Sequence, residues 1–175
     1  MFLPWYAISW SFLHANQGGG AHRSMEMISY SEFGRLRLRD FCGGEVAESD
    51  TPDWEWMNGE WYCDGVGFTW FGRLHDMPKE TGGLEVDLAE LPERVWSRIL
   101  ESLHLPLRAG MTFDSITSIL GQPSETLTLV EDRKTYEFRV GSAHPYGVSC
   151  TVLDDGGLIF VSVIREDVVS RIHAA

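Results

Sequence analysis

Cysteine is scarce in this chain of 175 residues, which contains only Cys42, Cys63 and Cys150. Three cysteines are an odd number, and their wide spacing fits neither a disulfide framework nor a zinc site. We therefore expect reduced thiols, which are typical of a cytoplasmic protein. Cys63 and Cys150 both stand among apolar residues, so each is expected to be a small buried hydrophobe.

Basic residues are also few, with 14 Lys and Arg against 26 Asp and Glu and a net charge of −12. Phosphate groups are bound by basic surfaces, so this balance argues against a nucleic acid or an anionic membrane as partner. A basic protein partner is compatible with it. Simple solubility is the plain alternative explanation of the acidity.

No hydrophobic run is long enough to span a bilayer. Residues 1–15, MFLPWYAISWSFLHA, are apolar but too short, and they lack the basic start of a signal peptide. The glycines of 18–20 then indicate a flexible break. Residues 1–24 are read as an extension upstream of a true start at Met25 or Met27, or as an aromatic arm that docks on a partner or on the domain.

Motifs for common chemistries are missing. The sequence contains no P-loop, no dinucleotide-binding glycine pattern, no His-Glu-x-x-His and no Gly-x-Ser-x-Gly. Its six histidines do not stand at metal-ligand spacings. We therefore predict no catalytic residues, no metal and no cofactor. The alternative is a small hydrolase-like enzyme that uses carboxylates, or His75 as a base with Asp76 as its orienting acid.

What the chain does contain is enough apolar material for a core, 43% hydrophobic and 12% aromatic residues. We expect a single α+β domain over residues 25–175. Its parts are a β-rich acidic and aromatic region (25–87), a helix–helix–four-strand meander (88–165) and a tail (166–175) that forms a short helix.

The second part carries the clearest local signals. Pro92 opens a helix that runs to about Leu103 and has apolar residues at spacings of three and four. Thr112 caps a second helix, which Gly121 ends. Turn residues then separate four strands of an antiparallel meander, predicted over 125–130, 134–140, 147–153 and 158–164.

Part of this region resembles a known group of proteins. The residues are Gly110-Met111-Thr112, Ile116, Ile119-Leu120-Gly121-Gln122-Pro123, Tyr136 and Asp155-Gly156, within about 107–164. They are similar to the SmpA/OmlA (BamE-like) and β-lactamase-inhibitor-like group. That resemblance implies two helices on one face of an antiparallel meander and a role in binding other proteins. A scaffold role in envelope assembly is the further possibility it implies.

The first part combines acids with aromatics. Residues 35–39 alternate Arg and Leu, which predicts a half-exposed strand. Residues 40–72 contain eight acids and no Lys or Arg. Within them, Asn58-Gly59 between aromatic runs predicts a β-hairpin with a type I′ turn. The tryptophans either pack in the core or remain exposed among the carboxylates.

We accordingly expect a protein-binding module of the inhibitor, immunity or regulatory type that binds a basic protein. Tryptophan and tyrosine supply binding area, and acids speed encounter with a positive surface. The expected contact surface combines the open face of the sheet with this hairpin. Its residues are Asp53, Trp54, Glu55, Trp56, Glu60, Trp61 and Tyr62.

Overall fold

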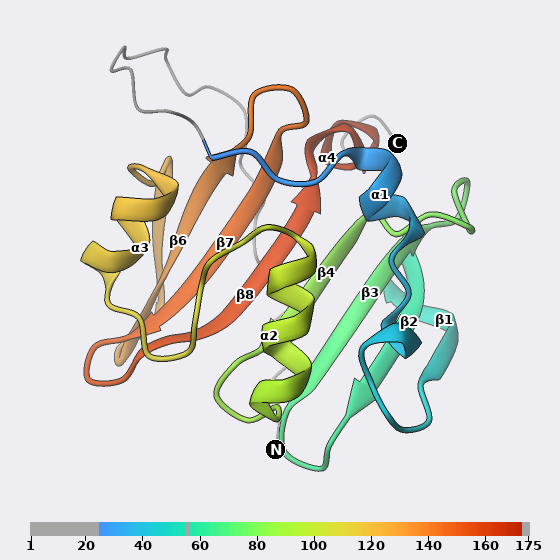
Figure 1. The fold of residues 1–175 in the computed structure, drawn as a ribbon, viewed down its shortest axis with the longest axis horizontal. Helices are drawn as coiled ribbons and strands as arrows, with labels where there is room; N and C mark the ends of the chain where they lie inside the picture. Colours follow the sequence, from blue (N-terminus) through green and yellow to red (C-terminus); the bar gives the residue numbers. More distant parts are fainter. Residues whose placement is uncertain (1–24, 55–56, 173–175) are drawn as a thin grey trace.

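The computed structural model describes residues 25–54 and 57–172, without the side chains of 49–57. It is an α+β protein built on one eight-stranded antiparallel sheet with a few short helices (Figure 1). The strand order is β1-β2-β3-β4-β8-β7-β6-β5. The strands are β1 (Ala47–Trp54), β2 (Met57–Cys63), β3 (Phe68–Leu74), β4 (Gly83–Asp87), β5 (Glu125–Val130), β6 (Arg133–Val140), β7 (Tyr146–Leu153) and β8 (Gly157–Arg165).

Two four-stranded meanders make up this sheet, and they join where β4 pairs with β8. The order of elements repeats: α1 (Tyr30–Arg35), the 3₁₀ helix η1 (Leu38–Asp40) and β1–β4 are followed by α2 (Glu93–Ser102), α3 (Phe113–Leu120) and β5–β8. A two-fold axis between β4 and β8 would relate the two halves. The sequence shows no internal repeat, so this symmetry lies in the topology alone.

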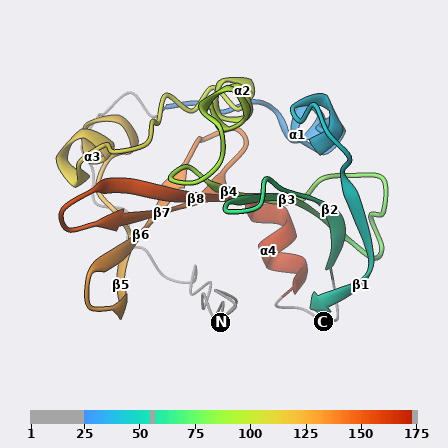
Figure 2. The same ribbon diagram turned by 90° about the horizontal axis from the view of Figure 1, so that it is seen from below.

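The helices are divided unequally between the two faces of the sheet (Figure 2). Helices α1, α2 and α3 lie on one face. Helix α4 (Glu166–Ile172) follows β8 directly and lies on the other. The sheet is curved, and its edge strands β1 and β5 bend toward the side of α4. We call this second side the α4 face.

The main core lies between the sheet and helices α1–α3. Helix α2 contributes a stripe that includes Val95, Ile99 and Leu100, which are at most 2% exposed. It meets alternate residues of the central strands, such as Val148 and Val163, which are opposite one another on β7 and β8. Full burial of an aliphatic side chain contributes about 1.5–3 kcal/mol, so this layer is the main source of stability.

The second half forms as its local signals indicate. Thr112 caps α3 by accepting a hydrogen bond from the Ser115 N–H at 3.3 Å, and Gly121 follows the helix with a positive φ of 87°. Ile116 is fully buried, and Phe113 stacks on Tyr136 with ring centroids 4.2 Å apart. The predicted helices and all four predicted strands are confirmed, as is the short helix of the tail.

The strand predicted for residues 35–39 is wrong. Ser29 and Glu32 form a capping box that starts α1, and the chain continues into η1. Arg37 does not line an open strand face, because its guanidinium donates to the carbonyls of Gly34 and Leu36. Carbonyl groups at the end of a helix lack partners within the helix. Here they accept the N–H groups of Arg37, which the alternating pattern had predicted to face solvent.

The predicted Asn58-Gly59 turn is also wrong. Both residues lie within β2, opposite Arg73 and Gly72 of β3. Trp54 at the end of β1 is opposite Met57 at the start of β2. Gly59 is needed for a different reason. A Cβ atom there would lie 2.2 Å from the Phe71 carbonyl oxygen and 2.7 Å from Nε1 of Trp70. The glycine lets β3 and an indole approach the strand.

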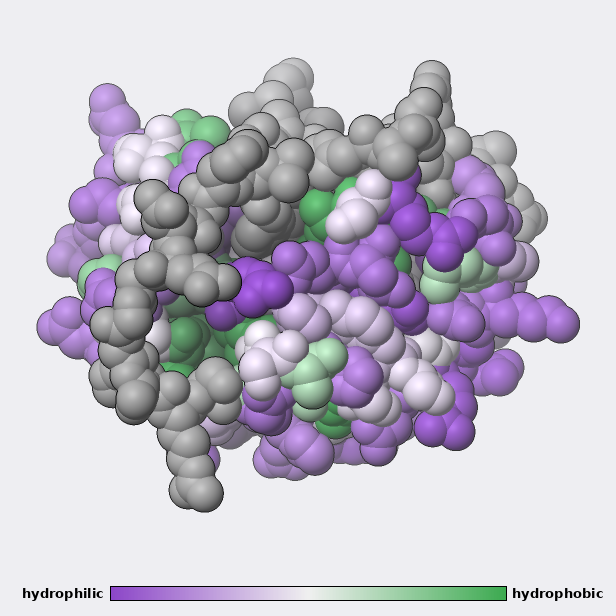
Figure 3. Space-filling model, turned by 90° about the horizontal axis from the view of Figure 1, so that it is seen from above, coloured by the Kyte–Doolittle hydropathy of each residue, from purple (hydrophilic) through white to green (hydrophobic). Residues whose placement is uncertain are grey.

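The end of the molecule that carries α1, α4 and the β6–β7 loop is mainly polar. Figure 3 views this end and shows hydrophilic residues over most of its coloured surface, with hydrophobic residues in small separate areas. No extended apolar surface is visible among the residues coloured in that view. The more unusual surface features of the described residues lie on the α4 face.

Candidate functional site

A row of polar side chains crosses the α4 face. Strand pairing places Glu125 opposite Glu137, Glu137 opposite Ser149, Ser149 opposite Ser162 and Ser162 opposite Glu85. We call these five residues the polar row. They face away from α1–α3, because their strand neighbours, such as Phe138 and Val163, fill the core. Residues opposite one another in a sheet have Cβ atoms about 4.5–5.5 Å apart, so each member can interact with the next.

Glu137 is the least expected member of the row. Its side chain comes from the middle of β6 and is only 1% exposed, yet neither carboxyl oxygen has a hydrogen-bond partner among the described residues. Burial, together with the neighbouring charge of Glu125, raises the pKa of Glu137 from 4.5 to about 7. Desolvation disfavours the charged form of an acid, and a nearby like charge adds to that effect.

The rest of the row extends this environment. Ser149 is also 1% exposed, and its hydroxyl has no hydrogen-bond partner within the part of the chain that the structure describes. At the other end of the row, burial raises the pKa of Glu85 to about 7. A buried polar group without a partner costs about 1–3 kcal/mol. The row therefore lowers the stability of the fold, as binding sites often do.

Aromatic residues continue the row beyond Glu85. Trp70 is opposite Glu85 on β3, and Trp61 is opposite Trp70 on β2. Trp70 is partly buried and packs against the small core under α4, which includes Leu74 and Val168. Trp61 is 43% exposed. The same face thus carries buried carboxyl and hydroxyl groups and one exposed indole in a line across the sheet.

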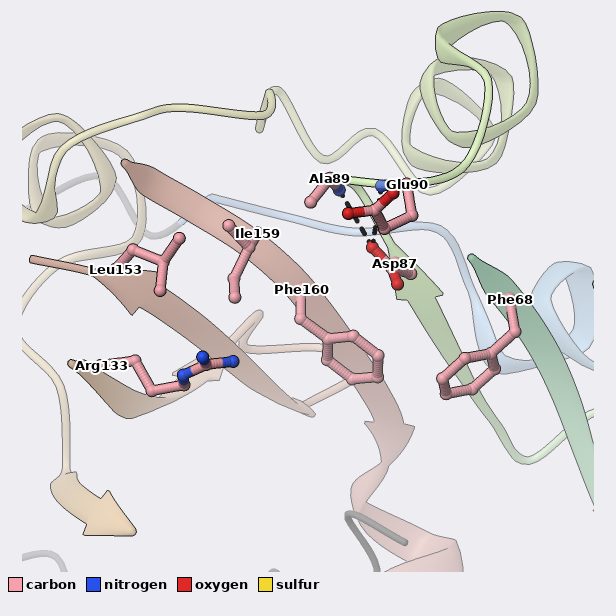
Figure 4. Close-up of a pocket in the computed structure, with 8 residues that line it drawn as sticks. All are labelled: Phe68, Asp87, Ala89, Glu90, Arg133, Leu153, Ile159 and Phe160. Atoms are coloured by element: carbon pink, nitrogen blue, oxygen red, sulfur yellow. Dashed lines mark hydrogen bonds between the residues drawn. The ribbon is translucent and has the colours of Figure 1, made fainter. Parts of the chain in front are cut away.

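A hollow of about 300 Å³ lies on this face, at the end of the sheet away from α4 (Figure 4). Phe68 and Phe160 come from the strands on either side of β4, and their ring centroids are 5.8 Å apart. Asp87 lies between these strands and accepts hydrogen bonds from the backbone N–H groups of Ala89 and Glu90. Burial nevertheless raises the pKa of Asp87. The hollow therefore adds a further acidic group beside aromatic rings.

The structure divides the predicted contact residues between the two faces. Trp61 lies on the α4 face, but Glu60 and Tyr62 point to the side of α1–α3. Glu60 is 4% exposed, and its Oε2 accepts a hydrogen bond from the Leu38 N–H at 2.9 Å. It holds η1 against the sheet and presents no carboxylate to a partner. Tyr62 is half-buried against the main core.

The remaining predicted contact residues cannot be placed on a face. Glu55 and Trp56 lie outside the described residues. Asp53 and Trp54 belong to the described backbone of β1, but their side chains are outside the description. Their part in the predicted surface stays a prediction. The predicted amino-terminal extension, residues 1–24, also lies outside the described residues.

The groups considered for catalysis are not brought together. His75 and Asp76 are both exposed, and the Asp76 carboxylate pairs with Arg171 of α4. Cys63 is exposed, so its predicted burial is wrong, whereas Cys150 is fully buried as predicted. Burial raises the pKa of Cys42 to about 11 and the pKa of Cys150 still further.

Residues 25–54 and 57–172 contain no group of three or more His, Cys, Asp or Glu side chains placed to hold a metal ion. Within the same residues, no helix combines the length and the apolar character that a membrane crossing needs.

Sequence reasoning missed the polar row, although a signal for it exists. Along the second meander its members are 12 or 13 residues apart: 125, 137, 149 and 162. In a meander of strands of similar length, polar residues that recur once per strand lie side by side. Glu85 has no such signal, because only the pairing of β4 with β8 brings it to the row.

Comparisons with known proteins add no relative. Neither a family model, nor a curated protein, nor a solved structure matches this chain. The α4 face must therefore be interpreted from its own chemistry.

Proposed function

We propose that this protein binds another protein through its α4 face, as an inhibitor, immunity or regulatory protein does. The observation that carries the proposal is the line from Trp61 to Glu125, in which an exposed indole and acidic and hydroxyl groups share one side of the sheet. The partner that suits this line is basic.

Physical arguments support this choice of surface. Helices α1–α3 bury the opposite face, so side chains on the α4 face do not form the main core. Exposed tryptophan is enriched at the points that contribute most to protein binding. A net charge of −12 would also speed the approach of a positively charged protein.

The resemblance to the SmpA/OmlA (BamE-like) and β-lactamase-inhibitor-like group points in the same direction. The order of α2, α3 and β5–β8 is the one that this resemblance implies. Proteins of that group bind other proteins, and this supports a binding role over catalysis.

The test is capture of the partner from the native host, followed by measurement of its affinity for the purified protein. Trp61→Ala removes the exposed indole from the α4 face. Val66→Ala is the matched control, because Val66 is 64% exposed in the turn between β2 and β3. We expect the Trp61 variant to bind at least about tenfold more weakly, or about 1.4 kcal/mol, and the control to bind like the wild type.

Equal affinities of the wild type and the Trp61 variant would remove this end of the face from the binding site. Circular dichroism of both variants should match the wild type, since neither side chain belongs to the buried core.

A further inference from the structure

The polar row contains acidic groups that nothing among the described residues neutralises. Glu125 and Glu137 are opposite one another on β5 and β6, and like charges in that position destabilise a sheet. Within residues 25–54 and 57–172, neither oxygen of Glu137 has a hydrogen-bond partner, and the hydroxyl of Ser149 beside it has none. Three adjacent positions thus offer acceptor oxygens at one place.

Basic groups close to this place are already engaged. Arg139, two residues along β6 on the same face, pairs with Glu166 of α4 at 2.9 Å. Arg133, at the start of β6, pairs with Asp132 at 2.6 Å. Strands β7 and β8 bring only the hydroxyls of Ser149 and Ser162 to the row, and β4 brings Glu85.

The form of the site favours an organic cation. A divalent metal ion needs several oxygen ligands converging on one point, and the described residues hold no group of three or more potential metal ligands. A lysine or arginine head group instead takes oxygens that are spread along a line, because it carries several N–H donors. Its long apolar stem can lie along β5 beside Leu127, which is partly exposed.

We infer that Glu137, Glu125 and Ser149 form a subsite for the cationic head group of a lysine or arginine side chain on the bound protein. This inference rests on the proposed function and names the chemistry of the partner. The carboxylates carry the charge complementarity, and the Ser149 hydroxyl accepts one further N–H. Entry is from β5, where Glu125 and Leu127 are partly exposed.

A direct test uses small probes with the full chain. The protein is prepared with ¹³Cδ-labelled glutamate and titrated with the capped peptides acetyl-Gly-Lys-Gly-amide, its Arg counterpart and its Gln counterpart. The Glu137 carboxyl signal is assigned by its loss in Glu137→Gln. We expect a saturable shift with the Lys and Arg peptides and none with the Gln peptide. The Lys peptide should also lower the pKa of Glu137 by about one unit, a tenfold preference for the charged form.

Variants give the matched controls. Glu125→Gln and Ser149→Ala should each weaken the Lys peptide several-fold, and Glu137→Gln should abolish its effect on the neighbouring signals. Glu131→Gln removes an exposed acid from the β5–β6 turn and should change nothing. If Glu137→Gln does not fold, the Glu125 variant carries the same comparison.

No shift of the Glu137 signal, or the same shift with the Gln peptide, would overturn the subsite. The two proposals fail separately. If Trp61→Ala loses affinity for the partner but the peptides have no effect, the binding face is supported and the subsite is refuted. If the peptides have a specific effect but Trp61→Ala binds the partner as the wild type does, the subsite is supported and the indole is not part of the binding face.

Discussion

Replacing Glu137 by glutamine should stabilise the protein above neutral pH. The substitution keeps the shape of the side chain and removes a charge that burial disfavours. In the folded protein the pKa of Glu137 is raised from 4.5 to about 7, mainly by desolvation and further by Glu125. The wild type therefore loses stability when this carboxyl ionises, and the amide does not.

The sign and size follow from proton linkage. Between pH 4.5 and 7 the folded wild type holds a proton on Glu137 that the unfolded chain has released, so the free energy of unfolding falls as pH rises. A difference of 2.5 pKa units (7 minus 4.5) at about 1.36 kcal/mol each gives roughly 3 kcal/mol above pH 7. This is an upper limit, since the amide also needs hydrogen-bond partners.

Urea unfolding of the full chain at pH 5, 6.5 and 8 measures the effect. We expect nearly equal stabilities of the wild type and Glu137→Gln at pH 5. At pH 8 the variant should be more stable by up to about 3 kcal/mol, which is roughly 6–12 °C in Tm for a chain of this size. Glu131→Gln is the control, because Glu131 is exposed, and it should follow the wild type at each pH.

The reasoning would be refuted by a constant difference between the wild type and Glu137→Gln across the three pH values. It would also fail if the variant became less stable than the wild type as pH rises. Either result would mean that the Glu137 carboxylate gains favourable interactions when it ionises. Its place in the polar row would then have another explanation.

Three further predictions concern other parts of the fold. Gly59→Ala should cost at least about 2 kcal/mol in urea unfolding, since its Cβ would clash with backbone of β3, whereas Gly43→Ala, with no atom within 4 Å of its Cβ, should be near neutral. Thr112→Ala should cost about 1 kcal/mol by the same measurement, because it removes the α3 cap, and Thr112→Ser should restore most of it. Brief alkylation of the native protein should modify Cys63 alone of the three cysteines by mass spectrometry, and modification of a buried cysteine at the same rate would contradict the fold.

The second half of the fold could be predicted because its signals are local. Thr112 and Gly121 mark the ends of one helix within ten residues, and turn residues separate strands that pair with their neighbours in sequence. Each decision depends on side chains that are close along the chain. The bounds of the four predicted strands accordingly differ from those of β5–β8 by no more than one residue at any end.

The first half misled because its patterns have two explanations. Alternation over residues 35–39 is too short to outweigh the capping box of Ser29 and Glu32, which was present in the sequence and starts a helix. Asn58-Gly59 is typical of a turn, but here a glycine is needed because a larger residue would clash with the backbone of β3. This clash arises only when β2 and β3 are paired.

The candidate site was harder to predict than the fold. Glu85 joins the row that contains Glu125 only through the pairing of β4 with β8, which are far apart in the sequence. Glu60 shows the converse, since an acid among tryptophans resembles a surface residue until its bond to the Leu38 N–H is seen. Which side of a sheet a residue occupies depends on register, and register is set by the whole structure.

The pairing of β4 with β8 has a consequence for how the chain is made. Synthesis delivers β1–β4 first, and β4 then has a row of backbone donors and acceptors without a partner until Gly157–Arg165 emerges. During that interval the nascent protein has an open strand edge that could join another copy. Slower translation of residues 88–156 would lengthen the exposure, so the yield of soluble product should respond to codon choice in that segment.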